Sequence, residues 1–194
     1  MQNLRYGNTN TFYISGSKGG LLIDTDYAGT LPLFYKAIKN GHISIQDISC
    51  VLATHYHPDH IGLISELQKL GIMLLVVDVQ LPSIHFADEI FSRDKRLNYT
   101  PINEDPIKVI SCAESRAFLL SLGIDGEIIH TPSHSEDSIS VILDNGDCFV
   151  GDLEPLAYLS GYENNCSLVN DWESIMNFHP KRILYAHANE QLFT

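Results

Sequence analysis

A six-residue segment of the chain concentrates side chains that bind transition metals. The segment 55–60, HYHPDH, carries three imidazoles and one carboxylate directly after a strand-like apolar run. Imidazole and carboxylate together are a typical ligand set for zinc and other divalent transition metals. A helix cap at Asp59 would explain one of these residues and leave three histidines without a role. The segment therefore predicts part of a metal site.

The spacing within this segment predicts two neighbouring metal positions. Residues two apart on an extended chain point to the same side, so His55 and His57 can bind one ion together. Asp59 and His60 are adjacent and cannot easily join that ion. If a helix begins near Asp59, this pair lies in its first turn and faces a second position. Pro58 restricts His57 to extended geometry, which stiffens the loop.

Three further donors follow strand-like segments far along the chain. His134, Asp152 and His187 each stand just after a predicted strand, where side chains emerge at one edge of a sheet. Taken singly, each is equally well explained as a turn aspartate or as a histidine that bonds to the backbone. Their joint placement makes them candidate ligands.

Strand and helix patterns place these donors in an α/β or α+β architecture. The turns at 16–19 and at Asn145-Gly146 predict hairpins, and the mixed segment 80–105 predicts a long excursion with short helices. We expect strands at 11–15, 20–24, 50–54, 72–77, 127–130, 138–143, 147–150 and 182–186, and helices at 31–40, 61–70, 113–121 and 168–178.

Composition restricts the class of protein. A chain of 194 residues with 44% hydrophobic residues suits one domain, 1–194, with a sizeable core. The N-terminus lacks the features of a signal peptide and no apolar run has the length of a membrane helix, so we expect a cytoplasmic protein without a membrane partner. Four cysteines without C-x-x-C spacing indicate free thiols. The net charge of −12 argues against nucleic acid and leaves a small molecule as the expected partner.

The order of the motifs resembles that of the metallo-β-lactamase superfamily. His-x-His-x-Asp-His, a histidine after Thr-Pro-x, Gly-Asp after a strand and a histidine after a final strand occur in that order over nearly the whole chain. The resemblance implies a four-layer αββα sandwich with the site at one edge of two sheets. It implies that His55, His57 and His134 bind a first metal, that Asp59, His60 and His187 bind a second, and that Asp152 bridges them.

Asp24 and four substituted glycine positions qualify this resemblance. Asp24 matches a family turn in which the aspartate supports the metal loop, although a plain Asx turn explains it equally well. Where family members often have glycine, this chain has Asp26, Ser133, Ala186 and Ala188. Because glycine permits a positive φ that these residues resist, we expect altered backbone courses in their loops.

The implied activity is hydrolysis with two divalent ions, zinc foremost, with iron or manganese as alternatives. Two such ions lower the pKa of a shared water from about 16 towards roughly 7, and the resulting bridging hydroxide would attack a small ester, thioester or lactone. Asp59 would accept the proton of that water and deliver it to the leaving group.

Other activities stay open at this point. Ligand identity does not fix the metal, so a persulfide dioxygenase-like enzyme with one non-haem iron competes, as do a small phosphodiesterase and a binding protein that uses metal for stability. The remaining histidines, His42, His85, His130 and His179, do not match family ligand positions, and we expect surface or core roles for them. Substrate choice is expected to depend on the segments 80–105 and 153–166.

Overall fold

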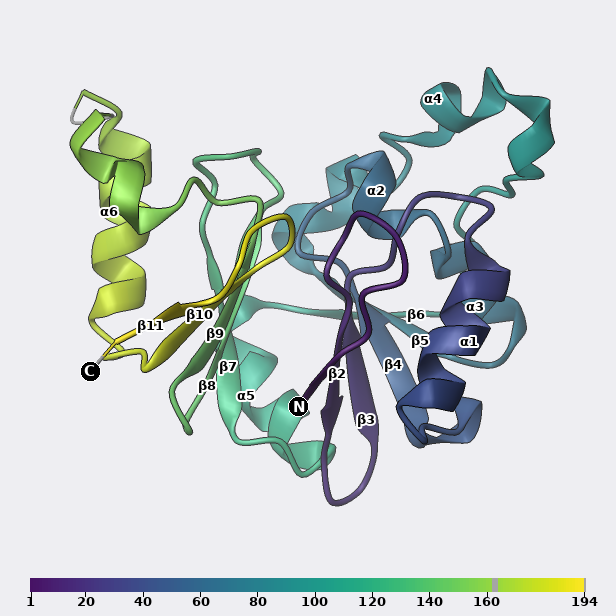
Figure 1. Cartoon of the computed structure of the whole chain (residues 1–194), viewed down its shortest axis with the longest axis horizontal. Coiled ribbons are helices and arrows are strands. Elements are labelled where there is room, and N and C mark those ends of the chain that lie inside the picture. The colour runs from purple at the N-terminus through teal and green to yellow at the C-terminus, as the bar shows by residue number, and fades with distance from the viewer. Residues whose placement is uncertain (162–163, 194) are drawn as a thin grey trace.

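Two β-sheets form the centre of the computed structural model, which describes residues 1–161 and 164–193. They pack face to face with helices on their outer sides, and this confirms the four-layer αββα fold (Figure 1). Residues 162 and 163, which belong to the segment 153–166 on which substrate choice is expected to depend, lie outside the described residues.

The first sheet has the strand order β1-β2-β3-β4-β5-β6. Strands β2 and β3 form the predicted antiparallel hairpin, and β3 to β6 run parallel. The two-residue strand β1 and the strand β6 were not predicted. The strands are β1 Gln2–Asn3, β2 Phe12–Ser15, β3 Gly20–Ile23, β4 Ile48–Leu52, β5 Met73–Val77 and β6 Ile107–Ile110.

The second sheet has the order β11-β10-β9-β8-β7. Strands β7, β8 and β9 pair antiparallel, with the predicted turn at Asn145-Gly146 between β8 and β9, while β9 and β10 are parallel. The short strand β11 was not predicted. The strands are β7 Gly126–His130, β8 Ile139–Leu143, β9 Asp147–Gly151, β10 Arg182–Tyr185 and β11 Gln191–Leu192.

Alternation along the buried strands divides the core into layers. On β3, Leu21 and Ile23 pack into the cluster between the sheets, whereas Leu22 joins the cluster under the outer helices. On β4, Leu52 and Val51 divide in the same way. Successive strand side chains point to opposite faces, so a strand covered on both sides reads as a continuous apolar run.

The helices agree with the sequence pattern except at one point. The prediction of one continuous helix over 61–70 is wrong, because the helix is interrupted at Gly62 and Leu63 and forms α2 and α3 instead. A Cβ on Gly62 would lie 2.2 Å from the backbone nitrogen of Ala28, so this turn packs directly against another backbone segment. The helices are α1 Leu31–Asn40, α2 Pro58–Ile61, α3 Ile64–Lys69, α4 Asp88–Ser92, α5 Cys112–Ser121 and α6 Cys166–Met176.

The segment 80–105 is an excursion with short helices, as predicted. It begins within the 3₁₀ turn Asp78–Ser83 and contains α4 and the 3₁₀ turn Lys95–Leu97. In Figure 1 it projects beyond the first sheet on the side of α2. Among the described residues, no helix combines the length and the apolar character needed to cross a bilayer.

Candidate metal centre

The loop after β4 presents its donors as the spacing predicts. His57 has extended backbone angles, φ −72° and ψ 153°, immediately before Pro58 opens α2. This is the restriction that a following proline imposes. Asp59 and His60 consequently lie in the first turn of a helix, and both His55 and His60 are buried, at 1% and 0% exposure.

Neighbouring parallel strands bring the distant donors to the same edge. Gly151 at the end of β9 pairs with Tyr185 at the end of β10, so Asp152 and His187 follow close to one another. His134 follows β7 in the same sheet. The carboxyl ends of parallel strands commonly form sites in this way.

A first group of donors comprises His55, His57, His134 and Asp152. One donor atom from each lies within 4.8 Å of all the others. Nε2 of His134 lies 3.1 Å from Nδ1 of His57. Asp152 Oδ2 lies 3.9 Å from His55 Nε2 and 3.8 Å from His134 Nε2, so this carboxylate oxygen faces the first group.

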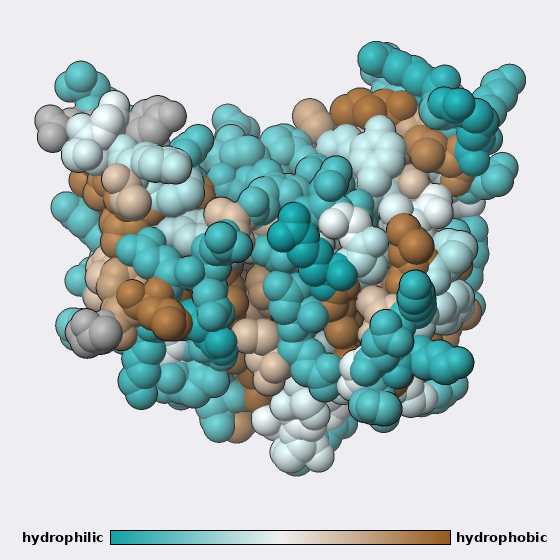
Figure 2. Space-filling model, in the orientation of Figure 1, coloured by the Kyte–Doolittle hydropathy of each residue, from teal (hydrophilic) through white to brown (hydrophobic). Residues whose placement is uncertain are grey.

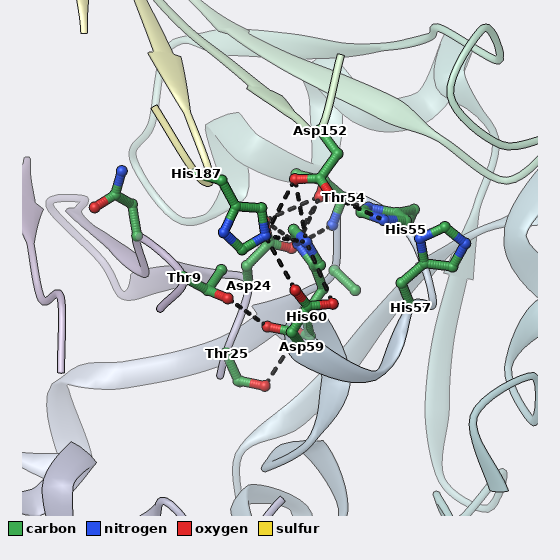
Figure 3. Close-up of polar contacts among 12 residues, drawn as sticks. Thr9, Asp24, Thr25, Thr54, His55, His57, Asp59, His60, Asp152 and His187 are labelled. Atoms are coloured by element: carbon green, nitrogen blue, oxygen red, sulfur yellow. Dashed lines mark hydrogen bonds and ion pairs between the residues drawn. The ribbon is translucent and has the colours of Figure 1, made fainter. Parts of the chain in front are cut away.

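A second group comprises Asp59, His60 and His187 (Figure 3). Nε2 of His187 lies 3.1 Å from Asp59 Oδ2 and 3.3 Å from His60 Nε2. The other oxygen of Asp152, Oδ1, lies 3.3 Å from both of these imidazole nitrogens. The structure thus brings all seven predicted residues together, with Asp152 between the two groups.

Two buried atoms test whether this arrangement fits divalent ions. His55 Nε2 and Asp152 Oδ1 are buried and form no hydrogen bond. An unsatisfied buried polar atom costs free energy, and native sites normally provide a partner. A cation in each group would coordinate these two atoms and would separate the imidazole nitrogens that face each other. The donor set therefore fits two ions.

Burial and neighbouring charges set the protonation of the site. Burial, reinforced by the nearby imidazoles, lowers the pKa of His55 far below its ordinary value, so its ring is neutral. A hydrogen bond from His187 lowers the pKa of Asp59 to about 2. Burial alone would lower the pKa of His60, but the carboxylates of Asp24 and Asp152 raise it to about 10. An arriving metal ion would therefore displace a proton from His60, since imidazole binds metals in its neutral form.

Asp24 supports the loop 54–60, which carries His55, His57, Asp59 and His60, and does not form a local Asx turn. Its carboxylate accepts hydrogen bonds from the backbone N–H of Thr54 at 2.6 Å and from the Thr54 hydroxyl at 2.9 Å. Its Oδ2 also lies 3.1 Å from Nδ1 of His60, which leaves Nε2 of that ring directed at the second group. Asp24 itself has φ +59°, a conformation that aspartate tolerates better than most residues.

Two buried residues that the sequence analysis did not identify also hold this loop. The side-chain amide of Gln80 donates to the carbonyl of Ala53 at 2.9 Å and to that of Asp137 at 3.2 Å. Asp137 in turn accepts from the backbone N–H of Tyr56 at 2.7 Å. Neither lies in a periodic pattern or motif, so the sequence contains no signal for these bonds.

The substituted glycine positions keep ordinary backbone angles. None of Asp26, Ser133, Ala186 and Ala188 has a positive φ. Asp26 uses its side chain instead, accepting hydrogen bonds from the backbone N–H groups of Thr9 and Tyr27. These loops therefore reach the site without the backbone freedom of glycine.

The other four histidines lie outside both donor groups. His85 contacts Asp88 and Glu104 within the excursion, at 2.8 and 2.9 Å. His130 bonds to the carbonyl of Glu136. His42 and His179 have φ +54° and +52° next to helix ends.

A cavity of about 270 Å³ adjoins the donor groups. Besides His134, Asp152 and His187, its lining includes Leu153 and Pro155 from the segment 153–166, on which substrate choice is expected to depend. No residue of the segment 80–105 lines this cavity, but Phe86 of that segment is 55% exposed and its ring centre lies 5.3 Å from that of His57. Figure 2 shows the molecule hollowed between the projections that carry α4 and α6.

Comparisons with known proteins bear on the family and the fold. A family model described as the metallo-beta-lactamase superfamily matches residues 4–187. A probable metallo-hydrolase of Methanocaldococcus jannaschii is 31% identical over 144 residues, which cover 72% of this chain and 65% of that protein. An atrochrysone carboxyl ACP thioesterase of Aspergillus aculeatus is 29% identical over 147 residues, covering 74% of this chain and 39% of that protein.

A solved structure in a di-iron-bound form shares the fold at 18% identity, with a TM-score of 0.72 over 99% of this chain and 94% of that one. The chain spans less than two thirds of the length of either curated relative.

Proposed function

The chain belongs to the metallo-beta-lactamase superfamily, and from that premise we propose that it is a hydrolase that uses two divalent metal ions to cleave a small ester, thioester or lactone. The observation that carries this proposal is the convergence of seven donors in two groups that share Asp152, where the buried atoms His55 Nε2 and Asp152 Oδ1 form no hydrogen bond.

We assign the first ion to His55, His57 and His134, the second to Asp59, His60 and His187, and the bridging position to Asp152. Zinc suits this combination of imidazole and carboxylate, and iron and manganese bind the same donor types. When bound, two such ions supply a Lewis acid for a carbonyl oxygen and water of lowered pKa. The role of the protein is to hold these donors in place before substrate arrives.

Asp59 is the residue that we assign to proton transfer. Its carboxylate is ionised at neutral pH: in the metal-free chain a hydrogen bond from His187 lowers its pKa to about 2, and a bound cation would also favour the charged form. It is half-buried and belongs to the donor group nearest Asp152 Oδ1. An ionised carboxylate in that position can accept a proton from water and pass it to a leaving group.

The surrounding surface favours a small uncharged acyl group. Leu153, Pro155 and Ala188 provide apolar contacts in the cavity, and no lysine or arginine is among its described lining residues. Phe86 adds an aromatic face beside His57. Two relatives are named as a probable metallo-hydrolase and as a thioesterase, and these names support cleavage of this kind of bond.

Elemental analysis combined with a substrate panel tests the proposal. We expect two zinc ions per chain and chelator-sensitive cleavage of neutral lactones, thioesters or activated esters. One iron per chain with oxygen uptake on a persulfide would instead identify a dioxygenase. Cleavage confined to phosphodiesters would change the substrate class, and tight metal binding with no turnover across the panel would identify a binding protein.

A further inference from the structure

Helix α6 lies against the outer face of the second sheet and touches two of the loops that carry candidate ligands. Its apolar face is formed by Leu168, Trp172 and Ile175, which are buried against β9 and β10. This spacing of four and three residues gives one continuous helix face. Asn165 caps the helix by accepting a hydrogen bond from the backbone N–H of Leu168.

Asp171 is a carboxylate on this helix that points away from solvent. It is 5% exposed, and it forms no ion pair with any described lysine, arginine or histidine within 4 Å. Its Oδ2 accepts a hydrogen bond of 2.8 Å from the backbone N–H of Ser133, the residue that precedes His134. Burial of an ionisable group is costly, so a retained buried carboxylate calls for a specific role.

Trp172, the next residue, makes the equivalent contact with another ligand loop. Its indole N–H donates a hydrogen bond of 2.9 Å to the backbone carbonyl of Glu154, two residues after Asp152. The ring is 1% exposed and packs with Leu153, which also lines the cavity beside the donor groups. Adjacent residues of one helix thus bond to the loops of His134 and Asp152.

We propose that Asp171 and Trp172 are positioning residues for the metal centre: Asp171 orients the His134 loop, and Trp172 orients the Asp152 loop. This inference rests on the proposed function, since it takes the two donor groups as metal sites. His134 and Asp152 lie on loops of the second sheet, and Asp171 and Trp172 bond to these loops from the helix that covers that sheet. Partners of this kind typically change metal affinity by roughly 10- to 100-fold when they are removed.

The two contacts predict different patterns of metal loss. His134 belongs only to the first donor group, so Asp171→Ala should weaken the first ion and spare the second. Asp152 lies between both groups, so Trp172→Phe, which keeps a buried ring and removes the N–H donor, should weaken both ions. Asp171→Asn keeps an acceptor oxygen and should restore most of the affinity lost in Asp171→Ala.

The experiment is a competitive titration of metal-free protein with Zn²⁺ and a chromophoric chelator, together with the visible absorption of the Co²⁺-loaded protein. The variants are Asp171→Ala, Asp171→Asn and Trp172→Phe, with Glu173→Gln at the next, exposed position of α6 as the matched control. We expect roughly 10-fold or greater weakening of the first ion in Asp171→Ala and a changed Co²⁺ spectrum, with the control unaffected.

A purely structural role would lower the melting temperature of the metal-free variants while both affinities stay at wild-type values, and this outcome would overturn the inference. If Asp171→Ala does not fold, Trp172→Phe still tests the inference, because unchanged affinity of that variant for both ions would also overturn the inference. Failure of the wild-type protein to bind two ions would instead reject the proposed function.

Discussion

Asp24 shows how one side chain links backbone conformation to the metal centre. It has a positive φ, and its carboxylate joins Thr54 of the metal loop to the Nδ1 side of His60. An asparagine at this position would tolerate that φ almost as well. Charge and conformation can therefore be separated here by a substitution that keeps the shape of the side chain.

We expect Asp24→Asn to weaken metal binding at the group of Asp59, His60 and His187 by roughly 10- to 100-fold, because the amide can no longer hold Nδ1 of His60 as a carboxylate does. Loss of a buried charged acceptor should also lower the free energy of unfolding by about 1–3 kcal/mol. Chelator competition and urea denaturation measure the two effects. Asp144→Asn, at an exposed site paired with Arg116, is the control, and unchanged affinity in Asp24→Asn would contradict the assigned role.

At this scale the donors were easier to predict from the sequence than their supports. His55, His57 and Asp59 stand out because their residue types and spacing carry the chemistry themselves. Gln80 and Asp137 hold the same loop through hydrogen bonds to carbonyl and N–H groups of the backbone. Such bonds leave no signature in residue types, so only the three-dimensional arrangement identifies them.

Among the secondary-structure elements, the break between α2 and α3 depends on Gly62. A Cβ there would meet three backbone atoms of residues 26–28 at 2.2 to 2.4 Å. The spacing of apolar residues through this region predicts one helix, and no local pattern reveals that a second backbone segment must fit against it. Strand β6 was not predicted for a related reason, because only its pairing with β5 defines four residues that are partly exposed.

We expect Gly62→Ala to lower the free energy of unfolding by about 1–3 kcal/mol or more. The added methyl group would meet backbone atoms, which cannot move aside as a flexible side chain can. Gly161→Ala is the matched control, because a Cβ at that position meets no atom of the described residues within 4 Å, and its effect should stay within about 0.5 kcal/mol. Denaturation in urea measures both variants. Equal stability of the two would show that the contact at Gly62 relaxes freely.

The excursion carries a histidine, His85, held between two carboxylates. Each of its ring nitrogens faces one of them, Asp88 or Glu104, and the phenol of Tyr99 donates to the same Asp88. The hydrogen bond with Glu104, followed by the contacts with Asp88, raises the pKa of His85 against the opposing effect of burial. Only the protonated ring can donate to both carboxylates, because neutral imidazole has a single N–H.

The stabilisation from these His85 contacts should be complete below the unfolded pKa of histidine, near 6.5, and should disappear as pH rises through the higher folded pKa. Its size should be within about 1 kcal/mol because His85 and Glu104 are exposed to solvent and Asp88 is partly exposed. Urea denaturation at a series of pH values, comparing the wild type with His85→Gln, measures it. A stability difference between the two proteins that does not shrink at high pH would contradict this expectation.

At the scale of the whole molecule, the two candidate donor groups lie where the two sheets meet. The loop after β4 in the first sheet supplies His55, His57, Asp59 and His60, whereas His134, Asp152 and His187 follow strands of the second sheet. Both donor groups contain residues from both sheets. Ions bound there would therefore add to the hydrogen bonds of Gln80 and Asp137, which already connect loops of the two sheets.

We expect metal removal to lower the melting temperature even though the core between the sheets remains. An ion present at 100 times its Kd adds about 2.7 kcal/mol to the free energy of unfolding. For a chain of this size that corresponds to roughly 5 to 11 °C per ion.

Thermal unfolding with and without chelator, followed by re-addition of Zn²⁺, measures the effect. Asp152→Ala removes the donor between the groups, so its melting temperature should respond much less to metal. A wild-type melting temperature that is the same with and without chelator would show that the two sheets do not depend on metal for their connection.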